Sequence, residues 1–427
     1  MKTFRPLVVV IALFVALTAV ARQRAVRHPS APAGPTFSKE VVRILQDNCQ
    51  TCHHEGDIAP FPLVTYEDAK PYAQLIKLMT ATRRMPPWKP AEGCGTFMDE
   101  RKLTQQEIDT IGKWADAGAP EGNRAELPAP IDFSSGWALG QPDLILSNAE
   151  AYTPPEGTDT YRCFSMPTNL TSTTYVAAVD THPGDRETVH HVLTFIDTTG
   201  QSQKLDEDEA GPGYTCFGGP GLDQVGGTLG GWAPGSRPLE MPPDVAFELP
   251  ANARIVMQVH YHPHHGTPKA DRTEFGVYFA KKEPRATMRI LPIVNQTFTI
   301  PPHATNYEVR GDFVSSDLPI PLPYPAKIWL VAPHMHLLGK KMTVQMTTPD
   351  GQSHCLIDID DWDFNWQGAY RFTEPVIAPA GTRLWLKAYY DNSSGNPRNP
   401  NDPPRAVSWG EQTTDEMALA FVGVTLE

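Results

Sequence analysis

The sequence predicts a multidomain fold, with a small all-α domain followed by two antiparallel β-sandwich (jelly-roll) domains. Its 427 residues are too many for one ordinary domain. Helical patterns occur only before residue 123, whereas short runs of β-forming residues alternate with turn residues from about residue 141 onward. The 43 prolines, roughly twice the usual share, favour loop-rich β-sandwiches over long helices.

Composition excludes two broad classes of protein. The formal net charge of −13 argues against a nucleic-acid binder, because such proteins carry a basic patch or stripe. Hydrophobic residues make up 40% of the chain, which is enough to build packed cores, so a disordered chain is also excluded. The spacing of the 6 cysteines and 14 histidines carries most of the functional information.

Residues 1–21 have the pattern of a secretory signal peptide. Lys2 and Arg5 precede an apolar run over residues 7–20, and small residues end the segment at Ala21. An uncleaved anchor is the alternative, but the run is short for a bilayer span and no later segment is apolar enough. We therefore predict a secreted or periplasmic protein that has no stable membrane span after signal cleavage, in a compartment that permits disulfides.

After a linker over 22–36, residues 37–123 are predicted to be helical. Ser38 is a plausible N-cap of the first helix, and Thr104 with Glu107 forms a capping box before a later apolar pattern. Gly118 and a proline two residues later end that helix. Residues 124–140 have the composition of a second linker.

A C-x-x-C-H motif formed by Cys49, Cys52 and His53 follows the first predicted helix. Two thiols at this spacing can bond to the two vinyl groups of one haem, and the histidine then becomes the proximal iron ligand. A redox dithiol or half of a zinc site are the alternatives. Because no second C-x-x-C occurs and the motif ends in histidine, we predict one covalently attached c-type haem in a cytochrome c-like domain over residues 37–123.

A sixth iron ligand should be a methionine or histidine further along the chain. Met85 is the best candidate because two prolines follow it, which exclude helix and stiffen the loop. Met79 lies within an apolar helical pattern and is expected in the core, and Met98 is a weaker alternative.

The region after the second linker divides near Glu283 and Pro284 into two parts, residues 141–284 and 285–427. In both parts, short β-rich runs alternate with Pro, Gly and Asp turns, as in antiparallel sandwiches. We expect one sandwich from each part.

Three histidine clusters lie on or beside these strands: His190-His191, His260-Tyr261-His262 and His334-Met335-His336. On a strand, residues i and i+2 point to the same face, so an H-x-H pair can share a metal. Adjacent histidines point to opposite faces unless a bulge, or the use of different ring nitrogens, brings both to one ion. One isolated cluster would more often be surface or packing, whereas three are harder to dismiss.

The region from about residue 141 to the C-terminus resembles the type II copper, ascorbate-dependent monooxygenases, the family of peptidylglycine α-hydroxylating monooxygenase and dopamine β-monooxygenase. The matching stretches, in the same order and at similar spacing, are DTYRC at 159–163 with Ser165-Met166, ETVHHVL at 187–193, MQVHY at 257–261, HMHLLGK at 334–340 and DEM at 415–417.

The resemblance implies two copper ions. His190, His191 and His260 would bind the first, which handles electron transfer in the family. A second set, the catalytic one, would bind the copper that activates O2 and performs the hydroxylation: His334, His336 and Met417. A soft thioether favours Cu(I), which suits the second role.

Without the resemblance, Met417 and His262 would be interpreted differently. Met417 alone would be read as core, because it begins an apolar strand. His262 could compete for the first copper, but we interpret it, with His264 and His265, as a surface or supporting group, since the family pattern needs only His260.

Two departures from the family bear on the substrate. The arginine that anchors a peptide carboxylate in the amidating enzyme is Ala332 here, and its supporting asparagine and tyrosine are Leu419 and Phe421. The pocket is thus expected to be apolar, which argues against a C-terminal glycine peptide. The second departure is the attached cytochrome.

Four cysteines remain, Cys94, Cys163, Cys216 and Cys355, and they allow three pairings. Because the family is stapled by disulfides, a bridge between Cys163 and Cys216 within the first sandwich is plausible. Cys94 and Cys355 could tie the cytochrome to the second sandwich or be free.

These observations predict a secreted copper-dependent monooxygenase that hydroxylates a C–H bond of a small or apolar substrate with O2. Its electrons would enter through the haem, from ascorbate or from an electron-donor protein, and no nucleic acid would be bound. One alternative is an exported copper- and haem-binding protein that transfers electrons or handles copper without hydroxylase activity. The other is a jelly-roll module that binds sugar or protein.

Overall fold

The computed structural model of the chain describes residues 34–55, 57, 59–133, 136–157, 159–262, 269–315, 318–319 and 321–427. The predicted signal peptide, residues 22–33 of the predicted linker, and His264 with His265 lie outside the described residues. No helix within the described ranges is long and apolar enough to span a membrane.

The N-terminal region is helical, as predicted, and its short helices surround one small core. The elements are the π-helix η1 Phe37–Val41, α1 Val42–Asn48, α2 Tyr66–Ala69, η2 Lys70–Tyr72, α3 Ala73–Ala81, α4 Gln105–Asp116 and η3 Arg124–Glu126. The residues that fill this core almost without exposure are Phe37, Val41, Leu45, Ile111 and Trp114. Whether the region is a cytochrome c domain stays a prediction.

The predicted boundaries of α4 are confirmed, whereas the predicted N-cap of the first helix is wrong. The capping box of Thr104 and Glu107 is confirmed at the start of α4, and Gly118 follows its end with a positive φ of 83°. The Ser38 N-cap is wrong, because η1 begins directly after Thr36 and Ser38 lies buried within the first turn.

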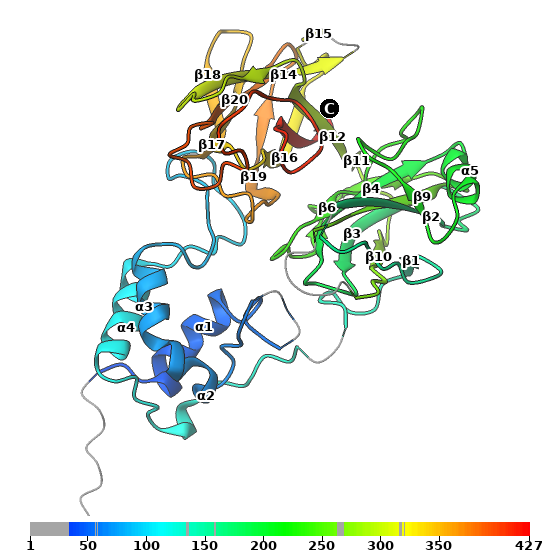
Figure 1. The fold of residues 1–427 in the computed structure, drawn as a ribbon. Coiled ribbons are helices and arrows are strands. Elements are labelled where there is room, and N and C mark those ends of the chain that lie inside the picture. The colour runs from blue at the N-terminus through cyan, green and yellow to red at the C-terminus, as the bar shows by residue number, and fades with distance from the viewer. Residues whose placement is uncertain are drawn as a thin grey trace, which may run out of the picture.

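Residues 82–104 are not helical: the exclusion of helix after Met85 is confirmed, and the prediction of helix for the rest of this segment is wrong. This segment contains three prolines, which cannot continue a helix, and it runs from α3 to the C-terminal β-region (Figure 1). Phe97 forms a β-bridge with Phe372, and a disulfide joins Cys94 to Cys355. The tie between the helical region and the second β-region, one of the two alternatives for these cysteines, is therefore present.

The first β-region contains eleven strands and one helix: β1 Leu144–Ser147, β2 Thr160–Pro167, β3 Thr174–His182, β4 Val189–Asp197, α5 Gln201–Asp208, β5 Tyr214–Thr215, β6 Gly231–Trp232, β7 Leu239–Glu240, β8 Val245–Leu249, β9 Arg254–Tyr261, β10 Glu274–Phe279 and β11 Ala286–Thr287. One sheet has the order β1-β10-β3-β8-β11 with β7 beside β3, and the other has the order β5-β2-β9-β4-β6. Val179 on β3 and Val192 on β4 share one core, so the two sheets pack face to face. All pairs are antiparallel except β8 with β11, and a disulfide joins Cys163 to Cys216.

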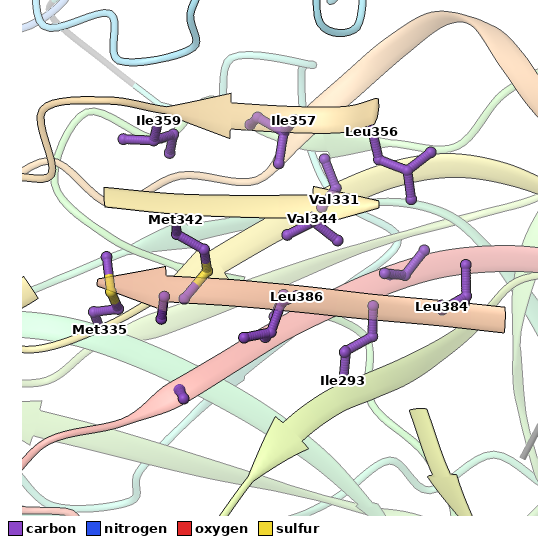
Figure 2. Packing of buried hydrophobic residues seen from close by; sticks show 14 of the residues in the cluster. Ile293, Val331, Met335, Met342, Val344, Leu356, Ile357, Ile359, Leu384 and Leu386 are labelled. Atoms are coloured by element: carbon purple, nitrogen blue, oxygen red, sulfur yellow. The ribbon is translucent and has the colours of Figure 1, made fainter. Parts of the chain in front are cut away.

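The second β-region consists of β12 Arg289–Asn295, β13 Thr299–Ile300, β14 Tyr307–Ser315, β15 Leu318–Pro319, β16 Ala326–His334, β17 Gly339–Thr347, β18 Ser353–Ile359, β19 Tyr370–Ala378, β20 Arg383–Tyr390, β21 Val407–Ser408 and β22 Ala418–Leu426. Its main sheet has the order β18-β17-β20-β14-β12-β22-β16-β19. Ile357 on β18 and Val331 on β16 belong to one core, so the sheet folds over on itself (Figure 2). Both β-regions are consistent with the predicted β-sandwiches.

Candidate metal centres

The first candidate site lies where β4 and β9 pair in one sheet. His191 is directly opposite His260 in the register, and a bulge between Val189 and His191 brings His190 to the same side. The Nδ1 atom of His191 lies 3.2 Å from Nδ1 of His190 and 3.4 Å from Nδ1 of His260. The bulge considered from the sequence is therefore present, and the three rings direct their Nδ1 atoms toward one point.

The environment of these rings favours neutral imidazoles. Burial lowers the pKa of His191 well below its usual value, and the neighbouring histidines lower it further. Burial also lowers the pKa of His260, although Asp159 opposes the shift. A neutral imidazole carries a lone pair on one nitrogen, and three lone pairs within 4.8 Å of one another fit a transition-metal ion such as copper.

His262 belongs to a neighbouring group rather than to the first three. Its Nδ1 bonds to the Asp159 carboxylate, and Asp159 also lies 3.8 Å from Nε2 of His260. The Nε2 atom of His260 is buried and has no hydrogen-bond partner among the described residues. This arrangement agrees with a supporting role for His262, which stays a prediction.

The second candidate site lies at the end of β16. Met335, directly after β16, is fully buried in the core of the second β-region (Figure 2), whereas His334 and His336 on either side of it line a cavity. Their ring centroids are 5.1 Å apart and the rings are nearly perpendicular. Nδ1 of His334 donates to Oε1 of Gln367, and Nδ1 of His336 donates to the Asp415 carbonyl at 3.2 Å. Both bonds leave Nε2 as the nitrogen that can bind a metal.

Met417 lies directly before β22, next to the strand that carries His334. β22 pairs with β16 so that Leu419 is opposite His334. The Met417 side chain is 5% exposed, and it lines the same cavity as His334 and His336. Two imidazole Nε2 atoms and one thioether can thus reach a common space, which fits a copper ion that cycles through Cu(I).

The Glu416 carboxylate connects the two segments of this second site, and only its place beside Met417 distinguishes it in the sequence. Its carboxylate is fully buried and accepts the backbone N–H groups of His336 at 2.9 Å, Leu338, and Met417 at 3.2 Å. Burial raises the pKa of Glu416 to about 8, although these N–H groups oppose the rise. The carboxyl therefore ties the turn after the H-x-H pair to the methionine.

One cavity of about 510 Å³ is lined by residues of both candidate sites. Its walls include His190 and His191 from the first site and His334, His336 and Met417 from the second. Ala332, Leu419 and Phe421, the positions expected to make the pocket apolar, also line this cavity. Charged lining residues come from the segment before α4, from β19 and from loops of the β-regions: Asp99, Arg101, Arg237, Arg371 and Glu411.

The C-x-x-C-H motif occupies the turns after α1. Cys49 and Cys52 form no disulfide, and burial raises the pKa of Cys49 to about 12 and also raises that of Cys52. Nδ1 of His53 bonds to the Phe61 carbonyl at 3.0 Å, which leaves Nε2 available to an iron ion. Met85 lies half-buried in the turn after α3. That Met85 reaches the iron opposite His53 stays a prediction.

Comparison with protein families finds one match. Residues 285–423 match the family model described as "Copper type II ascorbate-dependent monooxygenase, C-terminal domain". This range contains His334, His336 and Met417 but not the first histidine group.

Solved structures resemble the chain only weakly. The major capsid protein P2 from bacteriophage PM2 is 12% identical, with 63% of this chain and 97% of that chain covered and a TM-score of 0.24. Broad bean stain virus gives 9% identity, 69% and 92% coverage and a TM-score of 0.26. PNGF-II gives 10% identity, 66% and 65% coverage and a TM-score of 0.29. These scores are too low to carry an argument, so the family match alone supports a copper-dependent oxidoreductase of the monooxygenase type.

Proposed function

We propose that the protein is an exported copper-dependent monooxygenase that hydroxylates a C–H bond of a small, apolar substrate with O2. The observation that carries the proposal is that two separate sets of neutral metal-binding side chains face one cavity. His190, His191 and His260 would hold one copper ion through Nδ1. His334 and His336 through Nε2, with the Met417 thioether, would hold the other.

When bound, the copper ions would supply one-electron transfer and the activation of O2. The residues around the second set would keep it in place: Gln367 and the Asp415 carbonyl orient the two imidazoles, and Glu416 fixes the backbone on both sides. Ala332, Leu419 and Phe421 offer a substrate apolar contacts and no charged partner. A neutral apolar group therefore suits this part of the cavity, whereas Arg237 and Arg371 elsewhere in the lining are paired with Asp99.

We further propose that Cys49, Cys52 and His53 hold a c-type haem through which electrons enter, with Met85 as its sixth ligand. The raised pKa values of the two cysteines argue against a redox dithiol, which needs an accessible thiolate. The motif also lies close to the cavity wall, because a Cβ placed on Gly235 would be 3.7 Å from Sγ of Cys52. The Arg101 guanidinium donates to the Gly235 carbonyl at 2.9 Å and fixes this approach.

The proposal is tested with the full chain exported to an oxidising compartment and loaded with copper. Two copper ions and one haem per chain are expected, together with incorporation of one atom from ¹⁸O2 into an apolar substrate, found by oxygen uptake and mass spectrometry. Binding of both cofactors without label incorporation would favour the electron-transfer or copper-handling alternative. Negligible copper binding would favour the binding-module alternative.

The haem proposal has its own test. Reduced haem should be reoxidised by the copper-loaded protein without O2 in a stopped-flow experiment, and the copper-free protein serves as the control. If the copper-loaded protein leaves the haem reduced, electrons do not enter through it.

A further inference from the structure

The loop between β18 and β19, residues 360–369, contacts both candidate copper sites. Trp362 is buried and donates its Nε1–H to the His336 carbonyl at 3.2 Å. Gln367 accepts from Nδ1 of His334. The same loop therefore supports both histidines of the second site, and Phe364 lies between these two contacts in sequence.

Phe364 extends from this loop to the first site. Its ring stacks on His190, with centroids 4.8 Å apart and an interplanar angle of 16°. Its edge meets the His336 ring at 5.8 Å and 90°. Both arrangements are preferred geometries for ring pairs. Phe364 is only 6% exposed, and its ring contacts both imidazoles.

Two further contacts join the β-regions on the other side of the first site. The Tyr161 hydroxyl donates to the Glu411 carbonyl at 2.9 Å, and the Thr413 hydroxyl donates to Asp159 at 2.7 Å. Tyr161 stacks on His260 at 4.2 Å. Glu411 and Thr413 precede Met417 in one loop. The hydrogen bonds of this loop and the Phe364 ring therefore connect the two sites at two separate places.

We propose that Phe364 is a positioning residue that sets the separation of the two metal sites by filling the space between His190 and His336. The proposal rests on the assignment of both sites to copper. Ions held by the two sets would then lie on either side of one aromatic ring, and electron exchange between them would depend on the separation that the ring sets. Without the ring, the Tyr161 and Thr413 contacts and the hydrogen bond from Arg371 to the Glu240 carbonyl still join the β-regions, but the separation near His190 and His336 should become variable.

The test uses the full chain loaded with Cu(II) and electron paramagnetic resonance. In the natural protein, we expect a uniform dipolar broadening of both copper signals, because one ring would hold the two sites at a single separation. Phe364→Ala should retain two copper ions per chain and lose this uniform broadening. Phe364→Tyr should keep it, because the ring remains. Phe217→Ala is the matched control: Phe217 is an exposed aromatic that touches Tyr161 at 5.7 Å, and its loss should change nothing.

The outcomes distinguish the role of Phe364 from the assignment of the two sites to copper. Two copper ions with an unchanged dipolar broadening in Phe364→Ala would overturn the role of Phe364 and leave the copper sites standing. Fewer than two copper ions in the natural protein would overturn the proposed function itself. If Phe364→Ala does not fold, Phe364→Leu removes the aromatic ring while keeping an apolar side chain, and the same two readings apply.

Discussion

The two histidine sites face one cavity but are held in place by different means. The first site depends on backbone register: β4 and β9 are hydrogen-bonded neighbours, and a bulge between Val189 and His191 brings three Nδ1 atoms together. The second depends on side-chain hydrogen bonds from distant segments, through Gln367 and Glu416. A single substitution should therefore disable the second site without disturbing the first.

The largest effect is expected from Met417→Ile. The substitution removes the thioether but nearly conserves volume, so the fold should be kept while the second site loses its soft ligand. Hydroxylation should fall below detection, and copper should drop from two ions to one per chain, with the first site's spectrum unchanged. Met346→Ile, a buried methionine on β17 away from this cavity, is the control. Full activity in Met417→Ile would contradict the site assignment.

Glu416→Ala should have the next largest effect, on stability and on the second site together. Three buried N–H groups lose their acceptor, and each unsatisfied group costs about 1–3 kcal/mol. The free energy of unfolding, measured in urea, should fall by several kcal/mol, and the second copper should be lost before the first. Glu308→Ala, at an exposed position on β14, should change neither quantity. Unchanged unfolding of Glu416→Ala would show that the carboxyl is not a structural acceptor.

The ligands that lie close together in sequence could be predicted, whereas residues brought together by distant segments could not. The C-x-x-C-H motif and the H-x-H and H-H clusters place ligands a few residues apart, so strand and helix geometry alone suggested shared metals. Glu416 and His336 are 80 residues apart, and only the pairing of β16 with β22 brings them together. Met417 could be found only through the family resemblance, because a methionine beside an apolar strand otherwise indicates core. The extended path of residues 82–104 was missed because its partner strands come much later in the chain.

Acid should destabilise the copper-free protein, in part through the second site. Burial lowers the pKa of His334 to about 4 and that of His336 to about 3. A histidine with a lowered folded-state pKa stabilises the fold above its unfolded pKa of roughly 6.5, and this stability is lost as pH falls toward the folded value. Between about pH 7.5 and about pH 4.5, each of the two should cost roughly 2 kcal/mol. Urea unfolding at both pH values measures the loss.

The pH effect is assigned to a residue by comparing two variants. His336→Asn should reduce the loss of stability in acid, because one buried titrating group is removed. His354→Asn, at an exposed position on β18, should leave the loss unchanged. An equal acid sensitivity in all three proteins would mean that the second site does not control it.

The smallest effect is expected from Gln367→Leu, which removes the acceptor for Nδ1–H of His334 and nothing else at the metal. Loss of such a supporting bond typically weakens metal affinity by about 10–100-fold. Chelator competition should show this weakening at the second site, since Gln367 bonds to His334 of that site. Gln367→Glu keeps an acceptor oxygen and should restore the affinity, whereas Gln106→Leu on the exposed face of α4 should have no effect. If Gln367→Leu binds copper as tightly as the natural protein, the orientation of His334 is set by the backbone, and the two sites are held by the same means after all.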